Sequence, residues 1–293
     1  MKISICIPVY NFDVRELIYA LRKEIDCYSI NAEIILIDDA SDEKFKSINR
    51  FQDQVAQLVL LDKNIGRSKI RNLFLNYAQG DYLLFLDCDV KIENIHFLRN
   101  YFTEIETNPD VEVIYGNFKI DRKFSKTLRN RYSVEREIFS GSRSSDFSVL
   151  KTVNFLIKRD TFEKFIFNEK LTDYGYEDYI FAREMQLSGV KFSAINNPVI
   201  HFDDTINAFF LSKTETAINS LYRLSKDLEN ETLIKEIRVY RTANKVVRYR
   251  FKTIFLIIYN LFENLIKKNL LSENPNLMLF DIYKLSLMLK KLK

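Results

Sequence analysis

The chain has 293 residues, of which 47% are hydrophobic and 29% charged, and this composition excludes a disordered protein. Its three cysteines are odd in number and lack the spacing of a metal site, so they argue against a disulfide framework and favour a reducing compartment. The apolar segment at residues 3–9 is too short for a signal sequence or a membrane span. We therefore expect a cytoplasmic protein.

The net charge of +4 is unevenly distributed along the chain. Residues 233–293 contain 13 Lys and Arg against 4 Asp and Glu, a net charge of +9, and residues 1–232 contain 31 against 36, a net charge of −5. Such an asymmetry indicates an anionic partner for the basic part, either a membrane or a nucleic acid.

Apolar runs alternate with helical patterns through the first two hundred residues. The runs that predict strands occupy residues 3–9, 33–37, 55–61, 82–86, 111–115, 152–157 and 191–195. The patterns that predict helices occupy residues 14–25, 43–51, 67–78, 95–107 and 176–188. This alternation predicts βαβ units and an α/β fold with a mostly parallel central sheet and flanking helices. Residues 119–150 are polar and charged, and we expect a partly mobile excursion there.

The expected strand at residues 82–86 ends abruptly in Asp87-Cys88-Asp89. A continuous apolar run is typical of a central parallel strand, and ligands bind outside the carboxyl ends of such strands. Two carboxylates one residue apart suit a divalent cation that keeps water and substrate phosphates as its other ligands. The alternative is that Asp87 and Asp89 only cap a loop or the start of a helix.

The chain lacks the glycine-rich loops that cradle phosphates. A dinucleotide fold needs Gly-x-Gly-x-x-Gly after its first strand, and a P-loop needs Gly-x-x-x-x-Gly-Lys. The first glycine of this chain is Gly66. A metal held by side chains is the remaining common way to bind a diphosphate.

Five segments, in this order, resemble glycosyltransferase family 2, whose members have the GT-A fold. They are residues 5–11 (ICIPVYN), 37–42 (IDDASD), 64–72 (NIGRSKIRN), 86–89 (LDCD) and 175–178 (GYED). The resemblance implies a Rossmann-like catalytic domain at residues 1–212 and leaves residues 213–293 as a basic, helical C-terminal extension.

The resemblance also implies a set of donor-binding residues. The nucleotide is expected against Pro8, Tyr10, Asn11, Asp39, Asn64, Arg71 and Asp87. Asp39 can accept a hydrogen bond from an imide N–H, and Arg71 supplies a fixed cation. In the family, the second Asp of the pair usually binds Mg²⁺ or Mn²⁺ directly, so Asp89 is the expected ligand.

Other roles follow from the same resemblance. Asp87 is expected to bind the metal, the ribose or a metal-bound water, and His201 is expected as a distal metal ligand, although a lone His is often structural. His96 is expected inside a helix, without a role. Asn154 and the 119–150 excursion lie where family members build the acceptor site.

The resemblance makes Asp178 the general base on the acceptor hydroxyl, in a single in-line displacement with inversion. Glu177 is then expected to hydrogen-bond a substrate hydroxyl. The alternative is that both acids merely cap a helix, since carboxylates in a first helical turn are stabilised by the helix dipole.

The sequence predicts a helix at residues 206–228. The basic tail, residues 233–293, then predicts a second, amphipathic helix at 233–266. Basic residues follow one another at intervals of three or four along one stripe: Lys235, Arg238, Arg241, Lys245, Arg248 and Lys252. A parallel apolar stripe runs to Leu265, and the helix is too short and too charged to span a bilayer. It either docks on an anionic membrane surface or packs on the catalytic domain or on a second copy of the chain, as in a homodimer.

We therefore expect a metal-dependent, inverting glycosyltransferase that moves a sugar from a nucleotide-diphospho-sugar to a hydroxyl of a saccharide or lipid-linked acceptor. The expected donor is a UDP-sugar. The expected cofactor is Mn²⁺ or Mg²⁺, and no nucleic-acid partner is expected. The resemblance and the basic tail place the protein in bacterial surface polysaccharide synthesis, either free in the cytoplasm or on the inner face of the membrane.

Two rival functions remain open at this point. One is a non-catalytic donor-binding or scaffold protein of the same fold, which the presence of Asp39, Asp87, Asp89 and Asp178 together disfavours. The other is a sugar-nucleotide pyrophosphorylase, which would carry a Gly-rich, Arg-containing loop after its first strand.

Overall fold

The computed structural model describes residues 1–50, 56–141, 143–171, 174–227 and 230–292, and the chain divides into two compact units. The first unit comprises Met1–Asp121, Glu137–Thr172 and Phe181–Phe202, and the second comprises Arg122–Arg136, Asp173–Ile180 and Asp203–Lys293. The expected boundary after residue 212 falls inside helix α8 (Asn207–Leu224), and the division into a catalytic domain and an extension stays a prediction.

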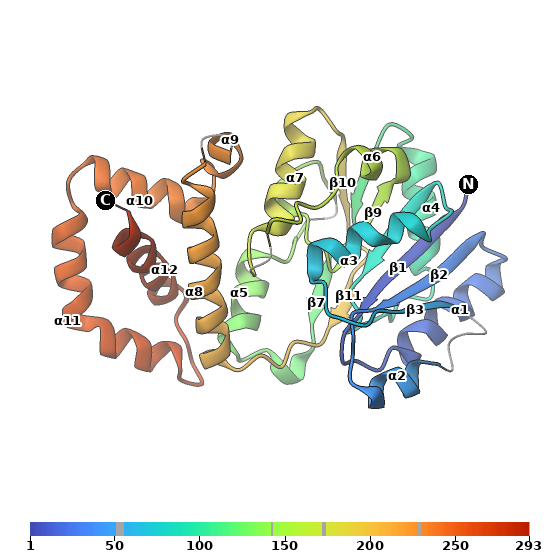
Figure 1. The fold of residues 1–293 in the computed structure, drawn as a ribbon, viewed down its shortest axis with the longest axis horizontal. Coiled ribbons are helices and arrows are strands. Elements are labelled where there is room, and N and C mark those ends of the chain that lie inside the picture. Colours follow the sequence, from blue (N-terminus) through green and yellow to red (C-terminus); the bar gives the residue numbers. More distant parts are fainter. Residues whose placement is uncertain (51–55, 142, 172–173, 228–229, 293) are drawn as a thin grey trace. The chain divides into compact units, whose positions relative to one another are not determined.

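The first unit is built on an eight-stranded sheet with the order β3-β2-β1-β4-β9-β6-β10-β8 (Figure 1). The strands are β1 (Ile3–Val9), β2 (Ala32–Asp38), β3 (Gln57–Leu60), β4 (Tyr82–Leu86), β6 (Val113–Tyr115), β8 (Arg143–Ser144), β9 (Asn154–Lys158) and β10 (Phe192–Ile195). Strands β1 to β4 pair in parallel, as do β6 and β10, whereas β9 lies antiparallel between β4 and β6. The mostly parallel α/β fold is thus confirmed.

Helices cover the faces of this sheet. They are α1 (Arg15–Tyr28), α2 (Glu43–Asn49), α3 (Arg67–Leu73), α4 (Phe97–Thr107), α6 (Arg159–Lys164) and α7 (Glu177–Leu187). All five residues of β4 are buried, as a strand covered on both faces requires. Phe85 of β4 stacks on Phe155 at 5.0 Å between ring centroids and meets Phe162 edge-on at 5.1 Å. Aromatic packing therefore fixes the strand that carries the two carboxylates.

A second, three-stranded sheet in the same unit has the order β5-β11-β7. Its strands are β5 (Val90–Lys91), β11 (Val199–His201) and β7 (Phe118–Ile120). β11 pairs antiparallel with β5, and the register places His201 opposite Val90. β11 follows the strand expected at 191–195, and the sequence predicted no strand there.

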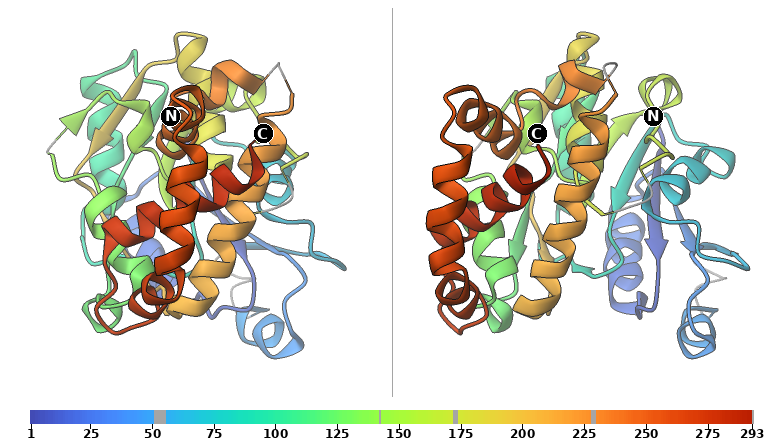
Figure 2. Two further views of the ribbon diagram at one scale, coloured as in Figure 1. Left: turned by 90° about the vertical axis from the view of Figure 1, so that its left-hand side faces the viewer. Right: turned by 60° about the vertical axis from the view of Figure 1, so that its left-hand side comes forward.

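The second unit is helical. Its helices are α5 (Leu128–Arg136), α8, α9 (Glu231–Ile234), α10 (Arg238–Arg248), α11 (Lys252–Leu270) and α12 (Leu277–Lys291). Figure 2 shows α12 enclosed by α8, α10 and α11, all of which it contacts. Phe280 and Tyr283 of α12 share an apolar core with Tyr259, Ile266 and Leu270 of α11. Among the described helices, none is both long and apolar enough to cross a membrane.

Two expectations about local structure are wrong. His96 precedes α4, which begins at Phe97 because the Glu24 carboxylate accepts hydrogen bonds from the Leu98 and Arg99 N–H groups of its first turn. The 119–150 excursion contains helix α5 and short β pairings, Leu128 of α5 is buried, and the expected partial mobility stays a prediction.

The amphipathic helix expected at 233–266 is three helices. α10 ends at Arg248, Arg250 has a left-handed backbone with φ of 61°, and α11 begins at Lys252. The hydrogen-bond ladder cannot continue through a left-handed residue, although the apolar spacing continues in the sequence. Parts of the expected elements at 43–51, 55–61, 119–150 and 206–228 lie outside the described residues, at positions 51, 55, 142 and 228.

Candidate active site

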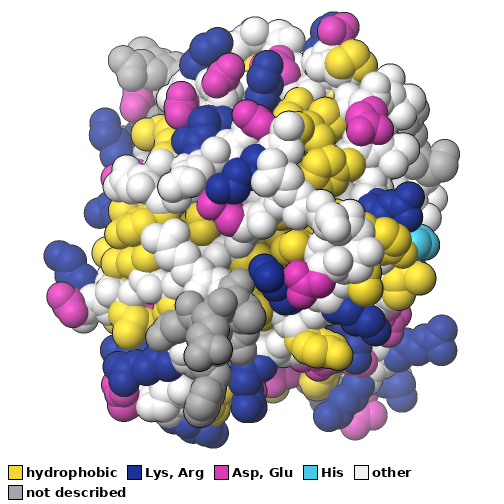
Figure 3. Space-filling model, turned by 90° about the vertical axis from the view of Figure 1, so that its right-hand side faces the viewer, with side chains coloured by type: hydrophobic (Ala, Val, Ile, Leu, Met, Phe, Trp, Pro, Cys, Tyr) yellow, Lys and Arg dark blue, Asp and Glu magenta, His cyan; other side chains and the backbone are white. Residues whose placement is uncertain are grey.

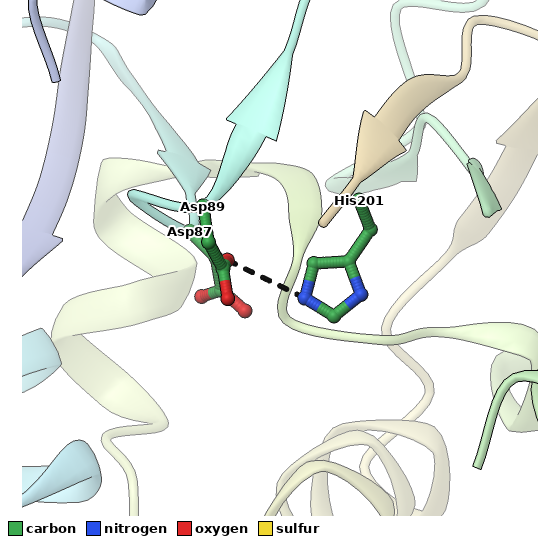
Figure 4. A group of neighbouring side chains, drawn as sticks. All are labelled: Asp87, Asp89 and His201. Carbon is green, nitrogen blue, oxygen red and sulfur yellow. Dashed lines mark ion pairs between the residues drawn. The ribbon is translucent and has the colours of Figure 1, made fainter. Parts of the chain in front are cut away.

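Asp87, Asp89 and His201 form one cluster, which we call the cation cluster (Figure 4). One ligand atom from each side chain lies within 4.8 Å of the others. His201 Nε2 is 3.4 Å from Asp89 Oδ1, and Figure 4 shows the two carboxylates side by side with the imidazole facing Asp89. The three residues that the sequence analysis proposed as metal ligands therefore lie together in the fold.

The two sheets position this cluster. Asp87 and Asp89 follow the buried end of β4, and the pairing of β11 with β5 sets His201 beside the residue that follows Asp89. The Phe202 N–H donates to the Asp89 carbonyl oxygen at 2.9 Å, and the Phe118 ring meets the imidazole edge-on at 5.9 Å. The imidazole is therefore held by backbone pairing and ring packing.

The chemistry of the cluster fits a divalent cation. Carboxylate oxygens suit Mg²⁺ and Mn²⁺, and imidazole is a common metal ligand. Burial raises the pKa of the Asp87 carboxyl, the Arg71 guanidinium opposes this shift, and the nearby Asp89 carboxylate adds to it. A cation between the two carboxylates would relieve their mutual repulsion.

Arg71 is almost fully buried and is committed to the cluster. Its Nη2 donates to Asp87 Oδ1 at 2.7 Å, and its Nη1 donates to the Arg67 carbonyl oxygen at 3.2 Å. The guanidinium also lies 5.7 Å from the Phe167 ring centroid. This geometry makes Arg71 a partner of Asp87, and its expected contact with the nucleotide stays a prediction.

Sequence reasoning missed Arg67. Its side chain is exposed at the start of α3, and its charge opposes the rise in the pKa of Asp87, which places it in the electrostatic surroundings of the cluster. Arg67 lies in the segment at residues 64–72 that resembles the family, one helical turn before Arg71. This spacing could have predicted that both side chains lie on the same side of the helix.

The other expected nucleotide-binding residues build a loop framework. Asp39 Oδ1 accepts from the Ile65 N–H at 2.7 Å and Asp39 Oδ2 from the Gly66 N–H at 3.2 Å, while Asn64 Nδ2 donates to the Asp39 carbonyl oxygen. Gly66 has φ of +84°, in the left-handed region that favours glycine. Asp39 is buried, so it anchors the loop before α3 whatever else it binds.

At the end of β1, Asn11 also adopts a left-handed backbone, with φ of 50°. Its N–H donates to Ser41 Oγ at 2.8 Å, and its Oδ1 accepts from the Asp42 N–H at 2.7 Å. Tyr10 is 54% exposed and Pro8 is half-buried, so the Tyr10 ring is open to a ligand.

Glu177 and Asp178 lie in the first turn of α7 and belong to the second unit. Glu177 Oε2 accepts from the Gly175 N–H at 2.9 Å, as a capping carboxylate does. Gly175 has φ of +110°, and a Cβ there would lie 2.5 Å from the Cβ of Ala217 in α8. The turn before Asp178 is therefore tightly constrained, and the catalytic roles of both acids stay predictions.

The expected contact of Asn154 with an acceptor is wrong. The side chain is fully buried, and its Oδ1 accepts from the Tyr101 hydroxyl at 2.5 Å. Its Nδ2 donates to the carbonyl oxygens of Asn117 at 2.8 Å and Asn197 at 3.0 Å. Asn154 therefore satisfies internal backbone groups beside β9, where no acceptor can reach it.

Comparison with known proteins agrees with this architecture. The model of the family described as "Glycosyl transferase family 2" matches residues 4–166. The amylovoran biosynthesis glycosyltransferase AmsB of Erwinia amylovora is 22% identical over 264 residues, which cover 85% of each chain.

Two solved structures share the fold. TarS 1–349 of S. aureus in complex with UDP has a TM-score of 0.56 and 17% identity, over 99% of this chain and 89% of that one. The mannosyltransferase PcManGT of Pyrobaculum calidifontis in complex with GDP-Man and Mn²⁺ has a TM-score of 0.60 and 16% identity, over 97% and 85%. Because the family model covers more than half of the sequence, the chain belongs to glycosyltransferase family 2 and is a glycosyltransferase of the GT-A fold.

Proposed function

We propose that the protein transfers a hexose from a UDP-sugar to a hydroxyl of a saccharide or lipid-linked acceptor, with inversion at the anomeric carbon and with Mn²⁺ or Mg²⁺ as cofactor. The observation that carries this proposal is the convergence of Asp87, Asp89 and His201 at the carboxyl end of a central strand. Ligands bind at that edge of an open α/β sheet.

Asp89 and His201 would hold the cation, with Asp87 as a third ligand fixed by Arg71. A bound divalent cation neutralises charge that develops on the diphosphate leaving group. A donor set with one imidazole favours Mn²⁺ over Mg²⁺, because Mg²⁺ is usually bound through carboxylates, phosphates and water. The exposed Arg67 is positioned to add a positive charge for the diphosphate.

In the transfer, the acceptor oxygen forms a bond to the anomeric carbon as the bond from that carbon to the diphosphate oxygen breaks. Asp178 takes the proton of the acceptor hydroxyl, and Glu177, which also accepts from the Gly175 N–H, orients a substrate hydroxyl. The place of Asp178 in the resembling segment at residues 175–178 and its half-buried position in the first turn of α7 support this assignment.

The named complexes support the choice of donor, since one similar structure contains UDP and another contains GDP-Man with Mn²⁺. The name of AmsB, which refers to amylovoran biosynthesis, supports a saccharide acceptor and a role in surface polysaccharide synthesis.

A panel of UDP- and GDP-sugars, assayed for slow hydrolysis with Mn²⁺, with Mg²⁺ and with EDTA, tests this proposal. We expect one UDP-sugar to be hydrolysed only when a divalent cation is present, and the Asp89→Ala variant to lack that activity. Equal hydrolysis in EDTA would contradict the metal, and exclusive use of a GDP-sugar would contradict the nucleotide. If the folded protein binds donor and hydrolyses none of the panel, the non-catalytic alternative gains support.

A further inference from the structure

Helix α11 exposes a continuous apolar face. Six of its large apolar side chains and that of the preceding residue are more than half exposed at positions 251 to 265, and Leu261 is 75% exposed. We call this surface the α11 face: Phe251, Ile254, Ile257, Ile258, Leu261, Phe262 and Leu265. Their spacing of three and four residues places them on one side of the helix. Contiguous exposed apolar patches of this kind mark interaction sites.

The opposite side of α11 is already used. Tyr259, Ile266 and Leu270 are buried in the core shared with α12. One side of α11 therefore packs inside the protein, and the helix is not apolar enough to cross a membrane. Its exposed side is suited to contact a surface that runs parallel to the helix axis.

Positive charge borders the α11 face. Between Ile237 and Phe262 the sequence contains six Lys and Arg and no Asp or Glu. Arg248 and Arg250 at the α10–α11 bend are exposed, as is Lys268 toward the end of α11. The acid of α11, Glu263, is paired with Lys267 at 2.9 Å and with Lys290 at 3.6 Å. By contrast, the face drawn in Figure 3 has basic and acidic side chains interspersed.

We propose that the α11 face docks on an anionic lipid bilayer, with the apolar side chains entering the interface and Arg248, Arg250 and Lys268 meeting the headgroups. This partner goes beyond the proposed transfer reaction. Charge complementarity favours lipid over a second copy of the chain, because a two-fold interface through this face would bring two positive borders together. The apolar contact therefore comes from α11 and the residue before it, and the charge comes from the end of α10, the α10–α11 bend and the later part of α11.

The chain contains no tryptophan, so one substitution introduces a single indole, whose emission is distinct from that of the 16 tyrosines. In Leu261→Trp, emission should move to shorter wavelength when vesicles of mixed phosphatidylcholine and phosphatidylglycerol are added, and brominated lipids should quench it. The matched control is Ile95→Trp, at a side chain of the first unit that is 69% exposed and lies outside the α11 face. Its emission should not change.

Two further variants, tested by vesicle co-sedimentation, distinguish the contribution of charge to lipid binding from that of apolar contact. Each Lys or Arg near an anionic surface is worth roughly a factor of five in affinity, so Arg248→Gln, Arg250→Gln and Lys268→Gln together should weaken binding about a hundredfold. The charge control replaces exposed Lys23 and Lys164 by Gln. Leu261→Gln with Leu265→Gln should also release the protein. All these side chains are exposed, so circular dichroism and the melting temperature should stay near wild type.

Three outcomes overturn the proposal. Wild type could ignore anionic vesicles at low salt, or it could bind pure phosphatidylcholine equally well. Light scattering could also show a dimer that Leu261→Gln with Leu265→Gln converts to a monomer, which would assign the α11 face to a second copy. Donor hydrolysis of the same variants distinguishes a failed docking proposal from a failed enzymatic one.

Discussion

Strand β4 and helix α11 are both rich in apolar residues, yet β4 buries all five of its residues and α11 buries three of its nineteen. In the first unit, apolar residues build the fold and hold two carboxylates at the end of a strand. In the second unit, part of the apolar surface stays outside the fold. Substitutions in β4 should therefore change stability, and substitutions on the outer side of α11 should change only what the protein attaches to.

The largest expected effect concerns Asp178, the proposed general base. Asp178→Asn keeps the shape of the side chain and cannot take a proton, so the transfer rate should fall by about 10² to 10⁴. UDP affinity should stay near wild type, because the donor is assigned to the first unit. Steady-state kinetics and calorimetry measure the two quantities. Exposed Glu273→Gln is the matched control, and a variant that keeps a tenth of wild-type transfer would move the base elsewhere.

The next effect compares two apolar positions directly. Phe85→Ala removes a ring that stacks on Phe155 in the first unit, and the unfolding free energy should fall by about 3 to 5 kcal/mol. Leu261→Ala, on the α11 face, should change it by no more than about 0.5 kcal/mol. Urea denaturation gives both values. A large loss for Leu261→Ala would mean that the α11 face is covered in solution, and the contrast between the two regions would disappear.

A smaller effect is expected at the cation cluster. In the presence of Mn²⁺, Asp89→Ala should weaken UDP binding at least about tenfold. Even the loss of a residue that only hydrogen-bonds to a metal ligand typically lowers metal affinity by about that factor. EDTA should have the same effect on wild type and none on the variant. Asp26→Ala, at an exposed acid paired with Arg22 in α1, should bind UDP like wild type. Unchanged affinity in Asp89→Ala would remove the metal from the donor site.

The smallest effect concerns a buried charge in the first unit. Glu24 caps α4 through the Leu98 and Arg99 N–H groups, and burial raises the pKa of its carboxyl. The folded state therefore binds a proton more readily than the unfolded chain, so the contribution of Glu24 to stability decreases as pH rises through the folded pKa. Glu24→Gln should flatten this dependence and cost about 1 kcal/mol at acidic pH. Identical pH profiles of the melting temperature would contradict this role.

Much of the first unit could be predicted from sequence because its signals are local. Apolar runs place β1, β2 and β4, and the two carboxylates follow β4 directly. His201 could be predicted only by resemblance, because its place beside Asp89 depends on the pairing of β11 with β5. The burial of Asn154 depends on three partners from distant segments, and no local pattern reports them.

The second unit was harder to predict for a related reason. The apolar spacing runs through the α10–α11 bend without interruption, whereas the left-handed residue that ends α10 is an arginine and not a glycine. Residue type therefore gave no signal for a break. Which side of α11 is buried depends on α12, which follows in the chain, and the sequence of α11 alone shows only that it is apolar.

The pairing of β11 with β5 also bears on the order of events during synthesis. Both carboxylates directly follow β4, but the imidazole is carried by the third residue of β11, 112 positions after Asp89. A nascent chain on the ribosome that has not yet released β11 has two of the three side chains of the cluster and no partner for β5. The centre is thus completed only after most of the first unit has been translated, and a product that ends at residue 198 would contain every strand of the large sheet while lacking the third ligand.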